Sequence, residues 1–127
     1  MNWLWADMEQ GLHEAVPQTT RIQLRKCMPR TTPYTFTHND LTNVNIMVQN
    51  GSLTGIIDWE MSGYFPVWWE YVCTSIPGNE EDREWKTLLR KYTPDHGAAR
   101  EFWMNYYYLC KDPENGRARK FIEASGR

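Results

Sequence analysis

Residues 36–48 read Phe-Thr-His-Asn-Asp-Leu-Thr-Asn-Val-Asn-Ile-Met-Val, and residues 55–60 read Gly-Ile-Ile-Asp-Trp-Glu. Asp40 stands five positions before Asn45, and Asp58 follows thirteen positions after Asn45. An aspartate and an asparagine at this spacing can place a proton acceptor and a metal ligand on opposite sides of one tight loop. The polar residues therefore have the spacing that phosphoryl transfer requires.

Between Asn45 and Asp58 the sequence predicts a β-hairpin. Apolar runs at 46–48 and 53–57 flank an Asn-Gly dipeptide, which favours the positive φ values of a two-residue turn. Such a hairpin would fold Asp58 back toward Asn45.

The residue types suit a magnesium-dependent reaction. Magnesium prefers hard oxygen ligands and takes one or two protein ligands beside phosphate groups, so Asn45 and Asp58 form a sufficient set. Asp40, on the loop before Asn45, is the candidate catalytic base that orients a hydroxyl and accepts its proton. His38 is expected to pack inward and to hydrogen-bond backbone, which would hold the loop in shape.

The string His-x-Asp-x-x-x-x-Asn, followed by a strand pair and Ile-Ile-Asp-Trp-Glu, resembles the catalytic and metal-binding loops of the aminoglycoside phosphotransferase family. Residues 34–72 carry the resemblance, and residues 63–72 are similar to the segment after the metal aspartate in fungal-type members. That family has the protein-kinase-like fold and includes kinases of choline and other small molecules. The resemblance implies ATP and magnesium as cofactors and a small-molecule hydroxyl as acceptor.

The chain departs from the family pattern in two respects. Members often have Gly where this chain has Asn39, and often Pro within the loop at 42–44. No glycine-rich phosphate loop, strand lysine or partner glutamate precedes residue 34, and the resemblance places those parts in an N-terminal lobe. Loss of one preorganised hydrogen-bond donor lowers the rate of a phosphoryl or acyl transfer roughly a hundred- to a thousandfold. We therefore expect a truncated chain, with little or no kinase activity as an isolated lobe.

The expected fold class is α+β, a mainly helical C-terminal lobe whose small hairpin carries the catalytic and metal loops. A chain of 127 residues suffices for one domain. We expect a leading helix and loop at 1–33, the two functional loops at 34–72 and a helical subdomain at 73–127.

Apolar residues recur at helical spacing before Pro17, which ends the pattern. They are Trp3, Leu4, Met8, Leu12 and Ala15. Residues 17–34 contain several prolines and clustered threonines, so they are predicted to be mostly loop.

Three further helices are predicted after the motif region. The first begins at the solvated acidic run 80–82, which suits a helix N-terminus. Its apolar stripe, expected to face a core, comprises Trp85, Leu88, Leu89 and Tyr92. The second spans about 98–110, and the last begins near Asp112-Pro113.

Charge and cysteine content restrict the partners and the compartment. A net charge of −2 and a pI near 5.9 argue against nucleic acid or an anionic membrane as the main partner and leave room for a cationic substrate. Three widely spaced cysteines favour reduced thiols in an intracellular protein. With no signal-peptide pattern or membrane-spanning run, a cytoplasmic location is expected.

Several alternatives stay open. Glu60 and Glu70 either contact a cationic substrate or pair with basic side chains. The chain could instead be a catalytically silent remnant, which binds an N-lobe-bearing partner or self-associates through exposed aromatic surface. A third interpretation is that the chain is a divalent-metal hydrolase that uses His38, Asp40 and Asp58.

Overall fold

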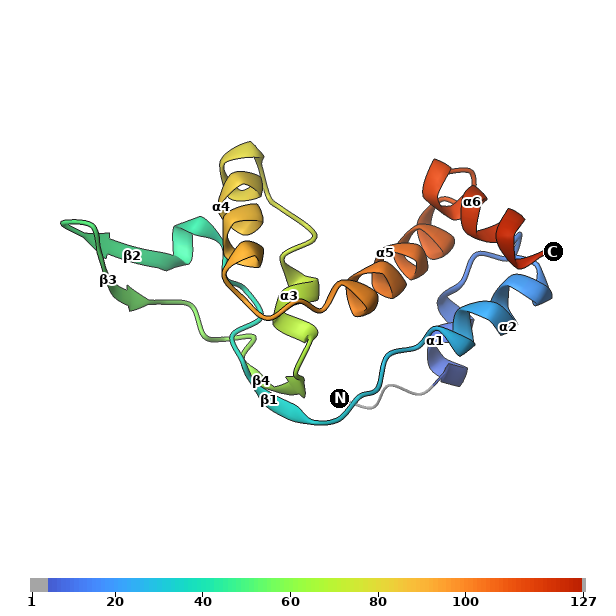
Figure 1. Ribbon diagram of the computed structural model, residues 1–127, viewed down its shortest axis with the longest axis horizontal. Coiled ribbons are helices and arrows are strands. Elements are labelled where there is room, and N and C mark those ends of the chain that lie inside the picture. Colours follow the sequence, from blue (N-terminus) through green and yellow to red (C-terminus); the bar gives the residue numbers. More distant parts are fainter. Residues whose placement is uncertain (1–4, 127) are drawn as a thin grey trace. The chain divides into compact units, whose positions relative to one another are not determined.

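The structure is a computed structural model that describes residues 5–126 (Figure 1). The described residues form six α-helices, one 3-10 turn and two two-stranded antiparallel sheets, so the predicted α+β class is confirmed. They divide into two compact units, one made of residues 5–30 and 97–126 and the other of residues 31–96. None of the described helices has both the length and the apolar character needed to cross a membrane.

The first unit is helical. Its helices are α1 (Trp5–Gly11), α2 (Gln18–Lys26), α5 (Gly97–Lys111) and α6 (Gly116–Ser125). Apolar side chains from all four helices and from the α1–α2 connection form its core, namely Met8, Leu12, Val16, Leu24, Phe102, Leu109 and Ala118. Burial of a leucine side chain contributes roughly 1.5–3 kcal/mol, so Leu24 and Leu109, which are fully buried, are major contributors to this core.

Helix α2 corrects the prediction that residues 17–34 are mostly loop. Pro17 lies at the N-cap with φ −63°, a backbone angle suited to a helix start, so this proline precedes a helix. Thr20 and Leu24 are fully buried on one face of α2. The Arg21 guanidinium also donates hydrogen bonds to backbone carbonyls of the preceding segment, which ties the helix down.

The leading helix is shorter than predicted, because α1 ends at Gly11 and Ala15 lies beyond it. Trp3 and Leu4 of the predicted pattern lie outside the described residues. The predicted helix at 98–110 is confirmed as α5. The predicted start of the last helix near Asp112-Pro113 is too early, since Asn115 caps α6 by accepting a hydrogen bond from the Arg117 backbone N–H at 2.9 Å.

The second unit contains both sheets. Strand β1 (Tyr34–Thr37) pairs antiparallel with β4 (Gly63–Pro66), and β2 (Ile46–Gln49) pairs antiparallel with β3 (Ser52–Ile56). The second pair is the predicted hairpin, and its turn residues Asn50 and Gly51 have φ of 52° and 76°. The β1–β4 pair was not predicted from the sequence.

Helices α3 (Trp69–Cys73) and α4 (Glu80–Lys91) complete this unit, and α4 packs against the 3-10 turn that precedes β2 (Figure 1). The acidic helix start is confirmed, but its predicted solvation is wrong at Asp82, which is 2 % exposed. The predicted core stripe is wrong at Leu88 and Tyr92, which are exposed, whereas Trp85 and Leu89 of that stripe are partly buried. The buried residues of α4 are Asp82 and Lys86.

Candidate active site

Asp40 and Asn45 are joined directly across the loop that leads into β2. The Asn45 side-chain Nδ2 donates to the Asp40 backbone oxygen at 2.9 Å and to its Oδ2 at 3.1 Å. The Thr42 backbone N–H donates to the same Asp40 backbone oxygen at 2.8 Å, and residues 43–45 form the 3-10 turn η1. Because the amide nitrogen of Asn45 faces Asp40, its Oδ1 faces the other way.

The hairpin brings the residue before Asp58 back against Asn45. That residue, Ile57, donates its backbone N–H to the Asn45 carbonyl oxygen at 2.9 Å. Asp58 itself has φ 62°, a left-handed conformation that asparagine and aspartate adopt more readily than other non-glycine residues and that clusters at functional sites. Its side chain is exposed.

His38 connects the two functional loops through both ring nitrogens. Its Nδ1 accepts a hydrogen bond from the Asp40 backbone N–H at 3.1 Å, so the proton resides on Nε2. Nε2 then donates to the Ile57 carbonyl oxygen at 2.8 Å. The ring is 4 % exposed and lies edge-on to Trp59. His38 has the contacts of a loop-structuring residue, and this arrangement leaves no ring nitrogen to bind the metal of the hydrolase alternative.

Glu70, in the first turn of α3, holds the other side of the loop at residues 38–45, which we call the catalytic loop after its proposed role. Its Oε2 accepts from the His38 backbone N–H at 2.7 Å and its Oε1 from the Asn39 backbone N–H at 3.0 Å. Both carboxylate oxygens therefore have a positioning role. Glu60 is exposed and makes no hydrogen bond or ion pair among residues 5–126. Substrate contact by either glutamate stays a prediction.

Asn39 has a backbone conformation that glycine adopts more readily than other residues do. Its φ is 75°, in the left-handed region that glycine adopts freely and asparagine tolerates best among the other residues. Its Nδ2 donates to the Met61 backbone oxygen at 2.7 Å, which compensates part of the backbone cost. Asparagine can thus replace glycine without loss of the loop conformation.

Helix α4 supplies an anchor for the middle of the catalytic loop. The buried carboxylate of Asp82 accepts from the Asn43 backbone N–H at 3.0 Å and from the Gly78 backbone N–H at 2.9 Å. Lys86, 6 % exposed, forms an ion pair with it at 2.9 Å. Burial by itself would raise the pKa of the Asp82 carboxyl, but the hydrogen bonds from Gly78, Lys86 and Asn43 outweigh burial and lower it.

A second side chain of α4 contacts the same loop. The Trp85 indole Nε1 donates to the Leu41 backbone oxygen at 2.9 Å. Two side chains about one turn apart on α4 thus hold residues 41 and 43, which lie between Asp40 and Asn45. Sequence reasoning missed this role, and the available signal was the Asp82-x-x-x-Lys86 spacing, which places opposite charges on one helix face.

Asn45 and Asp58 fit a divalent hard cation by their chemistry. Within the described part of the chain, Asn45 Oδ1 and the Asp58 carboxylate take part in no hydrogen bond, so both oxygens are available as ligands. An amide oxygen and a carboxylate are ligands that magnesium accepts beside substrate phosphates. Residues 5–126 contain no group of three or more His, Cys, Asp or Glu side chains that could hold a metal ion.

The chain was compared with protein families, curated proteins and solved structures. Residues 1–102 match the model of the phosphotransferase enzyme family (APH), and the matched range includes Asp40, Asn45 and Asp58. No curated protein matches the chain. No solved structure matches it either. The family match covers most of the chain, which therefore belongs to the phosphotransferase enzyme family, the family that its loops resemble.

Proposed function

We propose that this chain carries the transfer site for an ATP- and magnesium-dependent phosphoryl transfer to a hydroxyl of a small molecule. The observation that supports this most directly is the hydrogen-bond chain from Asn45 to Asp40 and from Ile57 to Asn45, which links the two predicted loops. We also propose that the chain has the fold of a kinase-like C-terminal lobe and that the protein is cytoplasmic.

Asp40 is the proposed catalytic base. Asn45 Nδ2 donates to its Oδ2, which fixes the carboxylate that would receive the proton of the acceptor hydroxyl. Asn45 Oδ1 and Asp58 would hold magnesium, whose charge would offset that of the transferred phosphoryl group. His38 and Glu70 hold the loop that presents Asp40, so they are positioning residues.

The activity of the 127-residue chain alone is proposed to be weak or absent. Its residues before position 34 contain no glycine-rich phosphate loop. Without such donors, nucleotide affinity and transition-state stabilisation depend on the two metal ligands alone.

Calorimetric titration with ATP and magnesium tests the metal site. Binding to the unaltered chain, weakened at least tenfold by Asp58→Asn, is the expected result. Asp7→Asn, which makes the same change on exposed α1, is the matched control and should bind as the unaltered chain does. Absence of binding in all three proteins would contradict the proposed nucleotide site and favour a silent module.

Transfer assays with ATP, magnesium, aminoglycosides and choline test the reaction. Slow turnover that Asp40→Ala abolishes is expected. Robust turnover by the unaltered chain would contradict the expectation of weak activity, and turnover that survives Asp40→Ala would contradict the role of Asp40.

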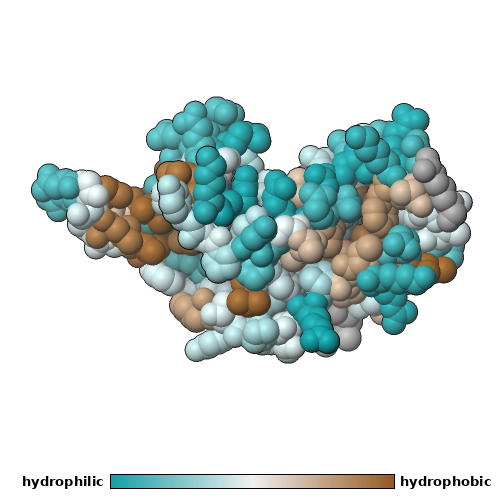
Figure 2. All heavy atoms as spheres, viewed as in Figure 1, coloured by the Kyte–Doolittle hydropathy of each residue, from teal (hydrophilic) through white to brown (hydrophobic). Residues whose placement is uncertain are grey.

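An exposed aromatic cluster favours a second candidate function, a binding module without catalysis. Phe36 stacks on Trp59 with ring centroids 6.0 Å apart and meets Tyr64 edge-on at 5.6 Å, and all three side chains are exposed. Figure 2 shows further hydrophobic surface over the β2–β3 hairpin, where Val48 and Leu53 are exposed. Exposed apolar surface of this kind marks interaction sites.

The proposed occupants of this surface are an N-lobe-bearing partner or a second copy of the chain. Sedimentation of the purified chain tests self-association. Oligomers that Tyr64→Glu dissociates would support it, and a monomer at all concentrations would contradict it.

A further inference from the structure

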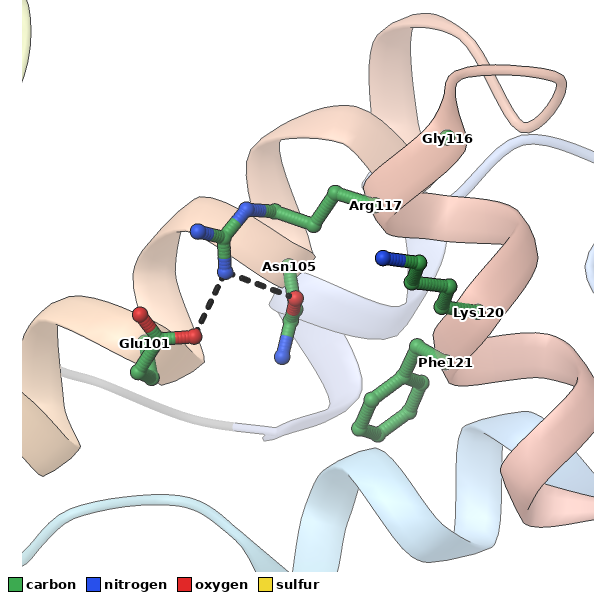
Figure 3. Close-up of a pocket in the computed structure, with 6 residues that line it drawn as sticks. All are labelled: Glu101, Asn105, Gly116, Arg117, Lys120 and Phe121. Atoms are coloured by element: carbon green, nitrogen blue, oxygen red, sulfur yellow. Dashed lines mark hydrogen bonds and ion pairs between the residues drawn. The ribbon is translucent and has the colours of Figure 1, made fainter.

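The first unit contains a cavity that the phosphotransferase site does not use. Helices α5 and α6 pack against one another and leave a cavity of about 600 Å³ that is open to solvent. Its lining residues are Glu101, Asn105, Gly116, Arg117, Lys120 and Phe121 (Figure 3). Cavities of roughly 300–1,000 Å³ hold small organic ligands, so this one has a suitable size.

The polar lining of the cavity is rich in hydrogen-bond donors. Arg117 Nη1 donates to Glu101 Oε2 at 2.6 Å and to Asn105 Oδ1 at 3.3 Å, which fixes the guanidinium and engages one oxygen of each partner. The Asn105 amide nitrogen and the Lys120 ammonium form no hydrogen bond or ion pair with any described residue. In Figure 3 the Lys120 ammonium reaches from α6 toward Asn105 and Arg117.

The net charge of the lining is positive. Glu101 is the one carboxylate there and is already paired with Arg117, so the positive charge of Lys120 remains uncompensated by the lining. The unbonded Asn105 amide nitrogen and the surplus cation favour an anion with several acceptor oxygens, such as a carboxylate or a phosphate.

Phe121 adds an apolar wall below these polar groups. Its ring is partly buried and packs against the core of the unit, so its exposed part offers a flat apolar surface to the cavity (Figure 3). An inorganic anion would leave this surface uncovered. A ligand that joins an anionic head to a ring or short chain would satisfy both parts of the lining.

We propose that the cavity between α5 and α6 binds a small organic anion, with its carboxylate or phosphate at Lys120 and Arg117 and its apolar part on Phe121. This site is independent of the phosphoryl-transfer site and of its activity. The groups that recognise the ligand all come from the C-terminal part of the chain, residues 101–121.

Nuclear magnetic resonance titration of the ¹⁵N-labelled 127-residue chain tests this inference with four probes. Phenyl phosphate and benzoate combine a ring with an anion, inorganic phosphate lacks the ring, and benzyl alcohol lacks the charge. Phenyl phosphate or benzoate should shift the amides of the lining residues at millimolar concentrations and bind more tightly than the other two probes. The tighter of the two identifies the preferred head group.

Three variants complete the test. Lys120→Met should weaken binding roughly tenfold or more, as expected for loss of a charge-assisted hydrogen bond. Lys111→Met removes an equivalent charge from the exposed end of α5 and should leave affinity within twofold. Gly116→Leu should block the cavity without unfolding the chain, because a Cβ at Gly116 meets no atom within 4 Å.

The inference is overturned by any of three results: no shifts at the lining residues, equal affinity for benzyl alcohol, or unchanged binding by Lys120→Met. Spectra of each variant without ligand show whether it has folded. A variant whose spectrum matches the parent outside residues 101–121 gives a valid measurement.

Discussion

The Asp82 carboxylate accepts a hydrogen bond from the Asn43 backbone N–H at 3.0 Å and thereby joins helix α4 to the catalytic loop. Asp82 also pairs with buried Lys86, so one ion pair supports both the helix and the loop. Removal of one partner from a buried pair leaves the other charge without compensation, which is costly. The stability of the second unit and the geometry of its proposed site are therefore linked.

Asp82→Asn should lower the free energy of unfolding by about 3 kcal/mol, since Lys86 would remain buried without its partner. Urea denaturation followed by fluorescence measures this. Glu80→Gln breaks the exposed ion pair with Arg83 and is the control, with an expected change below about 0.5 kcal/mol. The double variant Asp82→Asn with Lys86→Met should cost less than the two single changes together. Equal effects of Asp82→Asn and Glu80→Gln would contradict the anchoring role.

The Asp82 carboxylate should make the free energy of unfolding depend on pH in the acid range. The pKa of Asp82 is lower in the folded chain than the ordinary value of about 3.9, so the unfolded chain binds a proton at higher pH than the folded chain does. The stabilisation is fully present above about pH 5 and is lost as pH falls toward the folded pKa. Unfolding measured from pH 7 to pH 3 should show this loss in the unaltered chain and a smaller one in Asp82→Asn. Parallel profiles for the two proteins would contradict it.

Glu70→Gln should loosen the catalytic loop, because an amide retains one acceptor oxygen where the carboxylate offers two to the His38 and Asn39 backbone N–H groups. Hydrogen bonds to charged groups contribute roughly 1.5–3 kcal/mol, so exchange of these two amides with deuterium should accelerate at least tenfold. Hydrogen exchange measured by nuclear magnetic resonance checks this. Glu60→Gln, on an exposed side chain without partners among residues 5–126, should leave both rates unchanged.

Thiol reactivity should separate the three cysteines. Burial, followed by the nearby Glu70 carboxylate, raises the pKa of Cys73 to about 12, and burial also raises the pKa of Cys110. Only thiolates react readily with iodoacetamide, and Cys27 is the exposed cysteine. Mass spectrometry at neutral pH should therefore find Cys27 modified first, and Cys27→Ser should remove the fast phase. Early modification of Cys73 would show that its surroundings are more open than described.

Local signals in the sequence predicted the parts of the site that depend on local structure. The Asn-Gly dipeptide specifies its own turn, and the turn fixes the hairpin that brings Ile57 to Asn45. The β1–β4 pair was missed because its partners, such as Tyr34 and Pro66, are far apart in the sequence and no turn joins them. Helix α2 was missed because a proline can either end one helix or begin the next. Only the burial of Leu24 in the structure shows that a helix follows Pro17.

Burial was the other property that the sequence did not reveal. Helical spacing predicted α4, but its apolar residues Leu88 and Tyr92 face solvent while Asp82 and Lys86 face inward. Which face of a helix is buried depends on what packs against it, here a loop whose backbone N–H groups require an acceptor. Polar anchors of this kind become visible only when the loop and the helix are seen together.

The hairpin turn gives a last prediction, on the geometry that sets the position of Asp58. Gly51 has φ 76°, so Gly51→Ala should force an unfavourable left-handed alanine and cost about 1 kcal/mol. Gly55→Ala, in strand β3 of the same hairpin, is the matched control, since its Cβ would only touch the Met47 Cβ at 4.0 Å. Urea denaturation should therefore show a loss for Gly51→Ala and no loss for Gly55→Ala. If metal binding by the Gly51→Ala chain falls as well, the turn also sets the distance between the proposed ligands Asn45 and Asp58.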